Sequence, residues 1–114
     1  MPDHSGVLIV DESGEYRTLI SAVLLAQGHE VFEAGDASEA VEQLGRRHYA
    51  AILIDLKMPH DGVSLLEYLG TAMPHVLART IVFVPWVNTP IWGTLTKPFH
   101  VDALVKAVTA CATQ

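Results

Sequence analysis

Two uninterrupted apolar runs, each followed directly by an acidic residue, restrict the fold of this chain more than any other feature. Residues 7–10 (VLIV) precede Asp11 and Glu12, and residues 51–54 (AILI) precede Asp55. A strand with one face in water would alternate apolar and polar residues, so both runs predict strands covered on both faces, as in a parallel sheet. The carboxyl ends of parallel strands form the edge at which open α/β sheets bind ligands. Asp55 is therefore a candidate site residue, although Asp is also common in turns and helix caps.

The rest of the chain alternates between helix-like and strand-like patterns. Ser13 is expected to cap a helix that ends at Gly28, and Asp36 with Glu39 forms a capping-box signature that opens another helix. The expected strands are residues 7–10, 30–34, 51–54 and 80–84 with a short fifth before Lys97, and the later helices are 37–44, 63–72 and 101–112. Strands that alternate with helices predict an α/β fold with a doubly wound parallel sheet, in a single domain of residues 1–114.

Composition and charge argue against several classes of protein. Half of the 114 residues are hydrophobic and 18% are charged, which is typical of a packed globule. Seven Lys and Arg against thirteen Asp and Glu give a net charge of −6, which would repel a nucleic acid backbone. The longest hydrophobic run, residues 49–54, is far shorter than the ~20 residues of a membrane span. Cys111 is the only cysteine and the opening residues lack a secretory signal, so we expect a cytoplasmic protein without direct nucleic acid or membrane binding.

The acidic residues at the strand ends suggest a site. If the strands at residues 7–10 and 51–54 are neighbours, Asp11, Glu12 and Asp55 meet at one edge of the sheet. Carboxylates in a small space repel each other unless one takes up a proton or they share a cation. Oxygen ligands suit Mg²⁺, which commonly serves phosphate chemistry. Lys97 in LTKPF could reach the same edge, and a cation that faces acids and metal favours phosphoryl transfer.

Three motifs, in their order and spacing, carry a family resemblance. They are VDE at residues 10–12, IDLKMP at 54–59 and TKPF at 96–99. Along nearly its whole length the chain resembles the receiver domain of two-component response regulators, a CheY-like fold with strand order 2-1-3-4-5. The resemblance implies that Asp55 accepts a phosphoryl group and that Lys97 contacts it. The implied Mg²⁺ ligands are Asp11, Glu12, Asp55 and the backbone carbonyl of Lys57.

The same resemblance implies the partners. The phosphoryl donor would be a histidine kinase or a histidine phosphotransfer protein, and the output would go to a downstream protein or to a second copy of the chain. The chain is expected to be a phosphoacceptor rather than an enzyme, apart from self-phosphorylation and self-dephosphorylation. Because the sequence ends with its last expected helix, no effector domain is expected.

The chain departs from the family at the switch positions. The fourth strand of the family ordinarily ends in Thr or Ser followed by a small residue, whereas Pro85 and Trp86 stand here. Proline offers neither a hydroxyl nor a backbone N–H to a phosphoryl group. Thr94 occupies the place of the family's aromatic switch residue, so both ends of the usual relay are altered. Glu12 replaces a more usual second Asp, which is expected to shift the metal without abolishing its binding.

The connection between the fourth and fifth strands is short. Eight residues, 85–92, connect these strands, whereas a crossover between parallel strands normally takes about a dozen or more. We expect a loop or at most one helical turn in place of the family's helix. The apolar residues of this segment either fold back over the sheet or form an exposed patch used for output or self-association. They are Trp86, Val87, Ile91 and Trp92.

Three functions compete at this point. The first is a receiver that is phosphorylated on Asp55. The alternative is a degenerate receiver that binds proteins without phosphorylation, which Pro85, Trp86 and the short crossover favour. A phosphatase with an aspartyl nucleophile would usually carry a second acid two positions later, where this chain has Lys57, so this third class is disfavoured.

Overall fold

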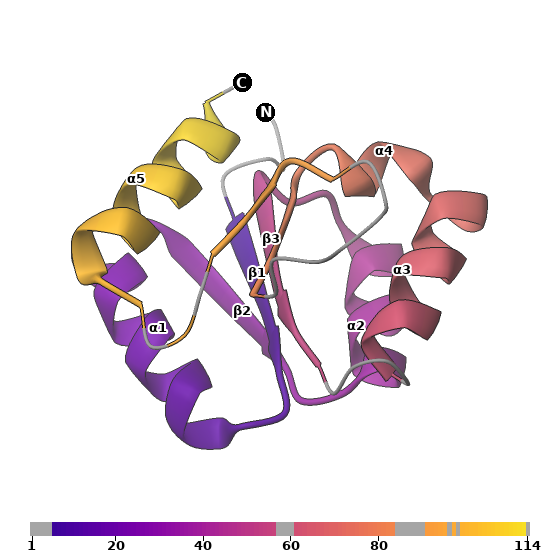
Figure 1. The fold of residues 1–114 in the computed structure, drawn as a ribbon, viewed down its shortest axis with the longest axis horizontal. Helices are drawn as coiled ribbons and strands as arrows, with labels where there is room; N and C mark the ends of the chain where they lie inside the picture. Colours follow the sequence, from indigo (N-terminus) through magenta and orange to yellow (C-terminus); the bar gives the residue numbers. More distant parts are fainter. Residues whose placement is uncertain (1–5, 57–60, 84–90, 96, 98, 114) are drawn as a thin grey trace.

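A five-stranded parallel sheet forms the centre of the molecule (Figure 1). The computed structural model describes residues 6–56, 61–83, 91–95, 97 and 99–113. The strands are β1 (Gly6–Asp11), β2 (Glu30–Ala34), β3 (Ala51–Asp55), β4 (Thr80–Val82) and β5 (Gly93–Thr94). Their spatial order is β2-β1-β3-β4-β5, and every neighbouring pair is parallel. The predicted fold class and strand order are therefore confirmed.

The register of β1 and β3 brings their last residues level with each other. Val10 pairs with Ile54 and Asp11 pairs with Asp55. All six residues of β1 and the first four of β3 are buried, as the continuous apolar runs predict. Two neighbouring central strands thus end in two adjacent carboxylates.

Four longer helices cover the two faces of the sheet. Helices α1 (Gly14–Ala26) and α5 (Val101–Ala112) lie on one face, and α2 (Ala37–Arg46) and α3 (Asp61–Ala72) lie on the other (Figure 1). The first face is packed by apolar side chains such as Ile20, Leu24 and Leu104, and the second by side chains such as Leu44 and Leu69. The alternation of strands and helices therefore produces two separate hydrophobic layers around one sheet.

The predicted helix start and stop signals operate as expected. The Ser13 side chain accepts a hydrogen bond from the Tyr16 N–H at 3.2 Å at the start of α1. Gly28 follows the end of α1 with a φ of 90°, a left-handed conformation that glycine adopts without steric cost. Asp36 Oδ1 accepts from the Glu39 N–H at 2.8 Å at the start of α2, where it satisfies an N–H that lacks a partner within the helix.

A short helix, α4 (Pro74–Leu77), lies between α3 and β4 and was not predicted. Pro74 stands in its first turn, where the missing N–H of proline costs nothing. The helix buries Val76 and Leu77, and the Thr80 hydroxyl donates a hydrogen bond to the Val76 carbonyl at 2.7 Å. Four residues are too few to show a helical period in the sequence. The main sequence signal for this helix is Pro74, which suits a first helical turn.

The described residues between β4 and β5 contain no helix, in agreement with the prediction that this crossover is reduced. Pro85, Trp86 and Val87 lie outside the described residues. Ile91 packs against the layer beneath α2 and α3, whereas Trp92 packs against the layer beneath α1 and α5. Both side chains are partly buried. For Ile91 and Trp92, this agrees with the alternative in which the apolar residues of the segment fold back over the sheet. Within the part of the chain that the structure describes, no helix is long and apolar enough to cross a membrane.

Candidate functional site

One lysine joins the two carboxylates at the carboxyl edge of the sheet. Lys97 Nζ lies 2.6 Å from Asp11 Oδ2 and forms a second ion pair with Asp55 Oδ2. Asp11 ends β1 and Asp55 ends β3, and the parallel register places them side by side. The structure thus brings together three of the residues that the sequence singled out, although Lys97 is 86 positions away from Asp11 in the chain.

The two carboxylates differ in exposure. The Asp11 residue is only 2% exposed, whereas the Asp55 side chain is 25% exposed. The Lys97 side chain is 17% exposed and lies against both. A molecule that approaches from solvent can therefore reach Asp55 far more easily than Asp11.

Asp11 is held in place by backbone and side-chain donors. The Ser13 N–H donates to Asp11 Oδ1 at 2.8 Å, so both carboxylate oxygens of Asp11 are engaged. Arg17 Nη1 donates to the Asp11 carbonyl at 2.6 Å, and Arg17 Nε donates to Glu33 Oε1 at 3.2 Å. Sequence reasoning missed Arg17, although a cation in the first turn of a helix that follows an acidic strand end could have been noted. These contacts make Asp11 a fixed anion beside Asp55.

Aromatic rings surround the Lys97 ammonium group. Its nitrogen lies 3.6 Å from the centre of the Tyr16 ring and 5.2 Å from the centre of the Phe83 ring. Phe99 contacts both, with ring centres 6.3 Å from Tyr16 and 6.1 Å from Phe83. A ring face attracts a cation, so these contacts stabilise the position of the ammonium group. Sequence reasoning also missed these rings, because their meeting depends on how α1 and β4 are placed in space.

Comparison with known proteins identifies the family. The profile of the family described as response regulator receiver domain matches residues 7–109. This chain belongs to that receiver family. The relationship agrees with the edge cluster of Asp11, Asp55 and Lys97 and with the observed strand order.

Several curated proteins are similar to this receiver domain. The CAI-1 autoinducer sensor kinase/phosphatase CqsS of Vibrio cholerae is 34% identical over 121 residues, which cover 91% of this chain and 17% of that protein. The response regulator protein FleR of Pseudomonas aeruginosa is 29% identical, covering 90% and 23%. The chain thus spans less than a quarter of these two relatives. Sporulation initiation phosphotransferase F of Bacillus subtilis is 26% identical, covering 90% of this chain and 89% of that protein.

Solved structures share the fold. The receiver domain of the Francisella response regulator 1452 has a TM-score of 0.82 and 25% identity, covering 96% of this chain and 98% of that one. The receiver domain of NtrX from Brucella abortus has a TM-score of 0.82 and 22% identity, covering 95% and 98%, and supports the fold alone.

Receiver domains typically use Mg²⁺, and the site chemistry here fits that ion. Asp11 and Asp55 each direct a carboxylate oxygen at the positive charge of the Lys97 ammonium group. Mg²⁺ is commonly held by one or two carboxylates plus water, so this pair of carboxylates suits the ion. Glu12 is exposed, and among the described residues no group of three His, Cys, Asp or Glu side chains is placed to hold a metal. Three carboxylates were expected to meet at this edge, and among the described residues two of them, those of Asp11 and Asp55, do so. The carbonyl of Lys57 lies outside the described residues.

Of the three altered switch positions, the structure describes Thr94. Thr94 pairs with Val82 in the short edge strand β5 and is exposed. Pro85 and Trp86 lie outside the described residues. Near the aspartates, Phe83 extends the chain beyond β4 and its ring faces Lys97. In this receiver domain, aromatic side chains therefore contact the lysine from α1 and from the end of β4.

Cys111 is an unreactive core residue rather than part of the site. It is fully buried in α5, and its Sγ contacts the carbonyl of Arg79 at 3.4 Å. Burial raises the pKa of the Cys111 thiol to about 11, with a smaller opposing effect from Arg79. Burial also raises the pKa of Tyr49, which lies near the other end of the sheet. Neither group is available as a nucleophile at neutral pH.

Proposed function

We propose that this receiver domain accepts a phosphoryl group on Asp55, with Mg²⁺, from a histidine kinase or a histidine phosphotransfer protein. The observation that supports this most strongly is the ion-paired cluster in which Asp55 is the accessible carboxylate and Asp11 the buried one. Relatives that include a sensor kinase and a phosphotransferase support the same class of partner.

The residues of the site have distinct roles in this proposal. A carboxylate oxygen of Asp55 attacks phosphorus, a bond to the donor's imidazole nitrogen breaks, and an aspartyl phosphate forms. Asp11, Asp55 and the Lys57 carbonyl would hold Mg²⁺, which would neutralise charge on the transferred group. Lys97 stays at the edge and pairs with a phosphoryl oxygen in place of the Asp55 oxygen that it contacts before transfer. Asp11 remains an anion that keeps Lys97 in reach.

The test is phosphorylation by a small-molecule donor such as phosphoramidate. Wild type should be labelled with Mg²⁺ and should not be labelled after chelation, as measured on a phosphate-affinity gel. Asp55→Asn keeps the shape but removes the nucleophile and should abolish labelling. Asp102→Asn, which neutralises an exposed acid in α5, is the matched control and should label like wild type. Labelling that persists in Asp55→Asn would refute the assignment.

A second candidate function is a degenerate receiver that works as a phosphorylation-independent binding module. The observation in its favour is Pro85 at the position where the family places a Thr or Ser hydroxyl. A folded wild-type chain that is never labelled under any of these conditions, yet binds a partner, would select this function instead.

For output we propose the face next to the short crossover. Ile91 and Trp92 are partly buried against opposite layers and are poor candidates for one continuous patch. The proposed contact surface, to a downstream protein or a second copy, therefore centres on Trp86 and Val87. Trp86→Ala should weaken partner binding while leaving phosphorylation of Asp55 intact, and unchanged binding would refute this part of the proposal.

A further inference from the structure

The segment that carries Lys97 is anchored to the sheet by a very short strand. β5, Gly93–Thr94, has two residues and pairs with the end of β4. One position further along, the Leu95 N–H donates to the Val82 carbonyl at 2.9 Å. Lys97 lies beyond these bonds. The position of its ammonium group therefore depends on the contacts of its own side chain.

Two kinds of side chain contact the Lys97 ammonium group. Asp11 and Asp55 each contribute a carboxylate oxygen. The rings of Tyr16 and Phe83 face the same nitrogen, and their centres lie 3.6 Å and 5.2 Å from it. The Lys97 side chain is mostly buried, so its nitrogen is partly desolvated. A ring face attracts a cation more strongly in such a place than at a fully exposed one.

These two kinds of contact respond differently to phosphoryl transfer as proposed above. Asp11 would share its negative charge between Lys97 and Mg²⁺, and Asp55 would carry the phosphoryl group. The ion pairs that hold Lys97 before transfer would thus weaken or change partner. An aromatic ring takes no part in that exchange, so its attraction for the ammonium group would remain.

The Tyr16 ring is tied to the same turn that holds Asp11. The Tyr16 N–H donates to the Ser13 hydroxyl oxygen at 3.2 Å, and the Ser13 N–H donates to Asp11 Oδ1 at 2.8 Å. Phe99 packs beside Tyr16 and Phe83, with ring centres 6.3 Å and 6.1 Å away. The ring that faces Lys97 and the carboxylate that pairs with it are therefore positioned together.

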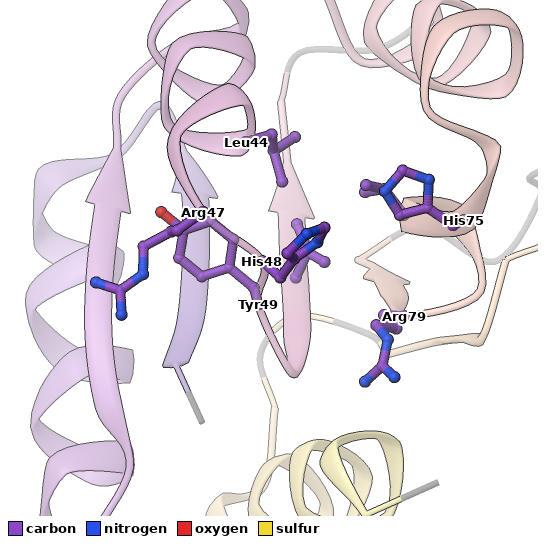
Figure 2. A pocket seen from close by; sticks show the side chains of 8 residues that line it. Leu44, Arg47, His48, Tyr49, His75 and Arg79 are labelled. Carbon is purple, nitrogen blue, oxygen red and sulfur yellow. The ribbon is translucent and has the colours of Figure 1, made fainter. Parts of the chain in front are cut away.

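A second cation, at the opposite edge of the sheet, shows how the Lys97 site differs. Arg47 Cζ lies 4.3 Å from the centre of the Phe32 ring and 5.9 Å from that of Tyr49, and Figure 2 shows Arg47 next to Tyr49. The acidic partner of Arg47 is Glu30, an exposed residue at the start of β2, 3.6 Å away. Lys97 instead pairs with the two carboxylates of the proposed site, one of them almost fully buried. The rings at Arg47 thus support a surface ion pair, whereas those at Lys97 adjoin the reacting group.

Given Asp55 as the phosphoryl acceptor, we propose that Tyr16 is a positioning residue for the transfer. Its ring face keeps the Lys97 ammonium group within reach of the phosphoryl group while both carboxylates bind other partners. Phe83 supports the same nitrogen from β4, at the longer distance. The aromatic face carries this role, so phenylalanine at position 16 should preserve it and leucine should not.

The first experiment compares rates of labelling by phosphoramidate with saturating Mg²⁺, at a temperature at which circular dichroism shows every variant to be folded. Tyr16→Leu should be labelled roughly three- to thirty-fold more slowly than wild type, the rate equivalent of a lost cation–π contact. Tyr16→Phe should be labelled at nearly the wild-type rate. Tyr68→Leu, which removes an exposed tyrosine in α3, is the matched control and should match wild type. A Leu variant as fast as wild type, or a Phe variant as slow as the Leu variant, would overturn the proposal.

A second measurement needs neither phosphorylation nor a substituted chain. The face of an aromatic ring shields the protons above it, so the ε-CH₂ protons of Lys97 should resonate upfield of those of Lys106, an exposed lysine in α5. This difference should persist when amide shifts around Asp11 show that Mg²⁺ is bound. Its loss on Mg²⁺ binding would show that the ring does not hold the ammonium group, and would overturn the proposal. A wild-type chain that keeps the upfield shift but is never labelled would instead refute the acceptor function of Asp55.

Discussion

The ammonium nitrogen of Lys97 lies 3.6 Å from the centre of the Tyr16 ring, directly beside the carboxylate of Asp11. Lys97 is therefore held by an ion-paired acid and by an aromatic face. The ring comes from the first turn of α1, which Ser13 caps, so the start of that helix is coupled to the site. Phe99 extends the contact towards α5, since its ring packs against Tyr16.

The first prediction concerns this ring. Tyr16→Leu removes the aromatic face and should lower the free energy of unfolding by about 0.5–2 kcal/mol, the usual range of a cation–π contact. Tyr16→Phe keeps the face and should stay close to wild type. Urea unfolding of the three proteins checks this order, and a Phe variant as unstable as the Leu variant would show that the hydroxyl matters instead.

The second prediction concerns the charge of Lys97. Lys97→Met leaves Asp11 and Asp55 adjacent without their shared cation, so stability at neutral pH should fall by up to about 3 kcal/mol. This is the lower end of the range for breaking a buried pair, because the Asp55 side chain is partly exposed. Added Mg²⁺ should raise the melting temperature of the variant more than that of wild type. Equal Mg²⁺ responses, measured by thermal unfolding, would argue against a metal bound by these carboxylates.

The third prediction tests a helix cap. Asp36→Ala removes the acceptor of the Glu39 N–H at the start of α2 and should cost about 1 kcal/mol of stability. Ser38→Ala changes an exposed residue inside the same first turn and serves as the control. Denaturant midpoints measure both, and a Ser38→Ala effect as large as that of Asp36→Ala would contradict the capping role.

The fourth prediction concerns the Cys111 thiol. Its pKa is raised to about 11, so the neutral thiol is favoured in the folded state. The stability that the folded state gains from keeping this thiol protonated is present below the ordinary thiol pKa. It is lost as the pH rises towards 11. A thiol-reactive disulfide reagent at mildly alkaline pH should label the folded chain much more slowly than the urea-unfolded chain. Equal rates would show that the thiol is exposed.

Sequence patterns were sufficient for the sheet and for the centre of the site. The burial of β1 and β3 follows from continuous apolar runs, and the acids that follow these runs must then meet at one edge. Lys97 could be assigned through its motif. These features are encoded locally or by the parallel arrangement of strands.

Other features depend on the packing of elements that are distant in sequence. The contacts of Tyr16 and Arg17 require the exact placement of α1 on the sheet. Helix α4 has only four residues, too few for a repeating helical pattern to show in the sequence. Apart from Pro74 and the position of Arg17 in the first turn of its helix, no local pattern carries this information.

The central claim is that Asp55 is the phosphoryl acceptor, and chemical mapping of the modified residue tests it most directly. Borohydride reduces an aspartyl phosphate to homoserine, a change that peptide mass spectrometry can assign to one position. After phosphoramidate treatment with Mg²⁺, we predict homoserine at position 55 and unchanged aspartate at position 11. Homoserine at any other position, or a phosphoryl group that resists reduction because it is on a hydroxyl or an imidazole, would contradict the account.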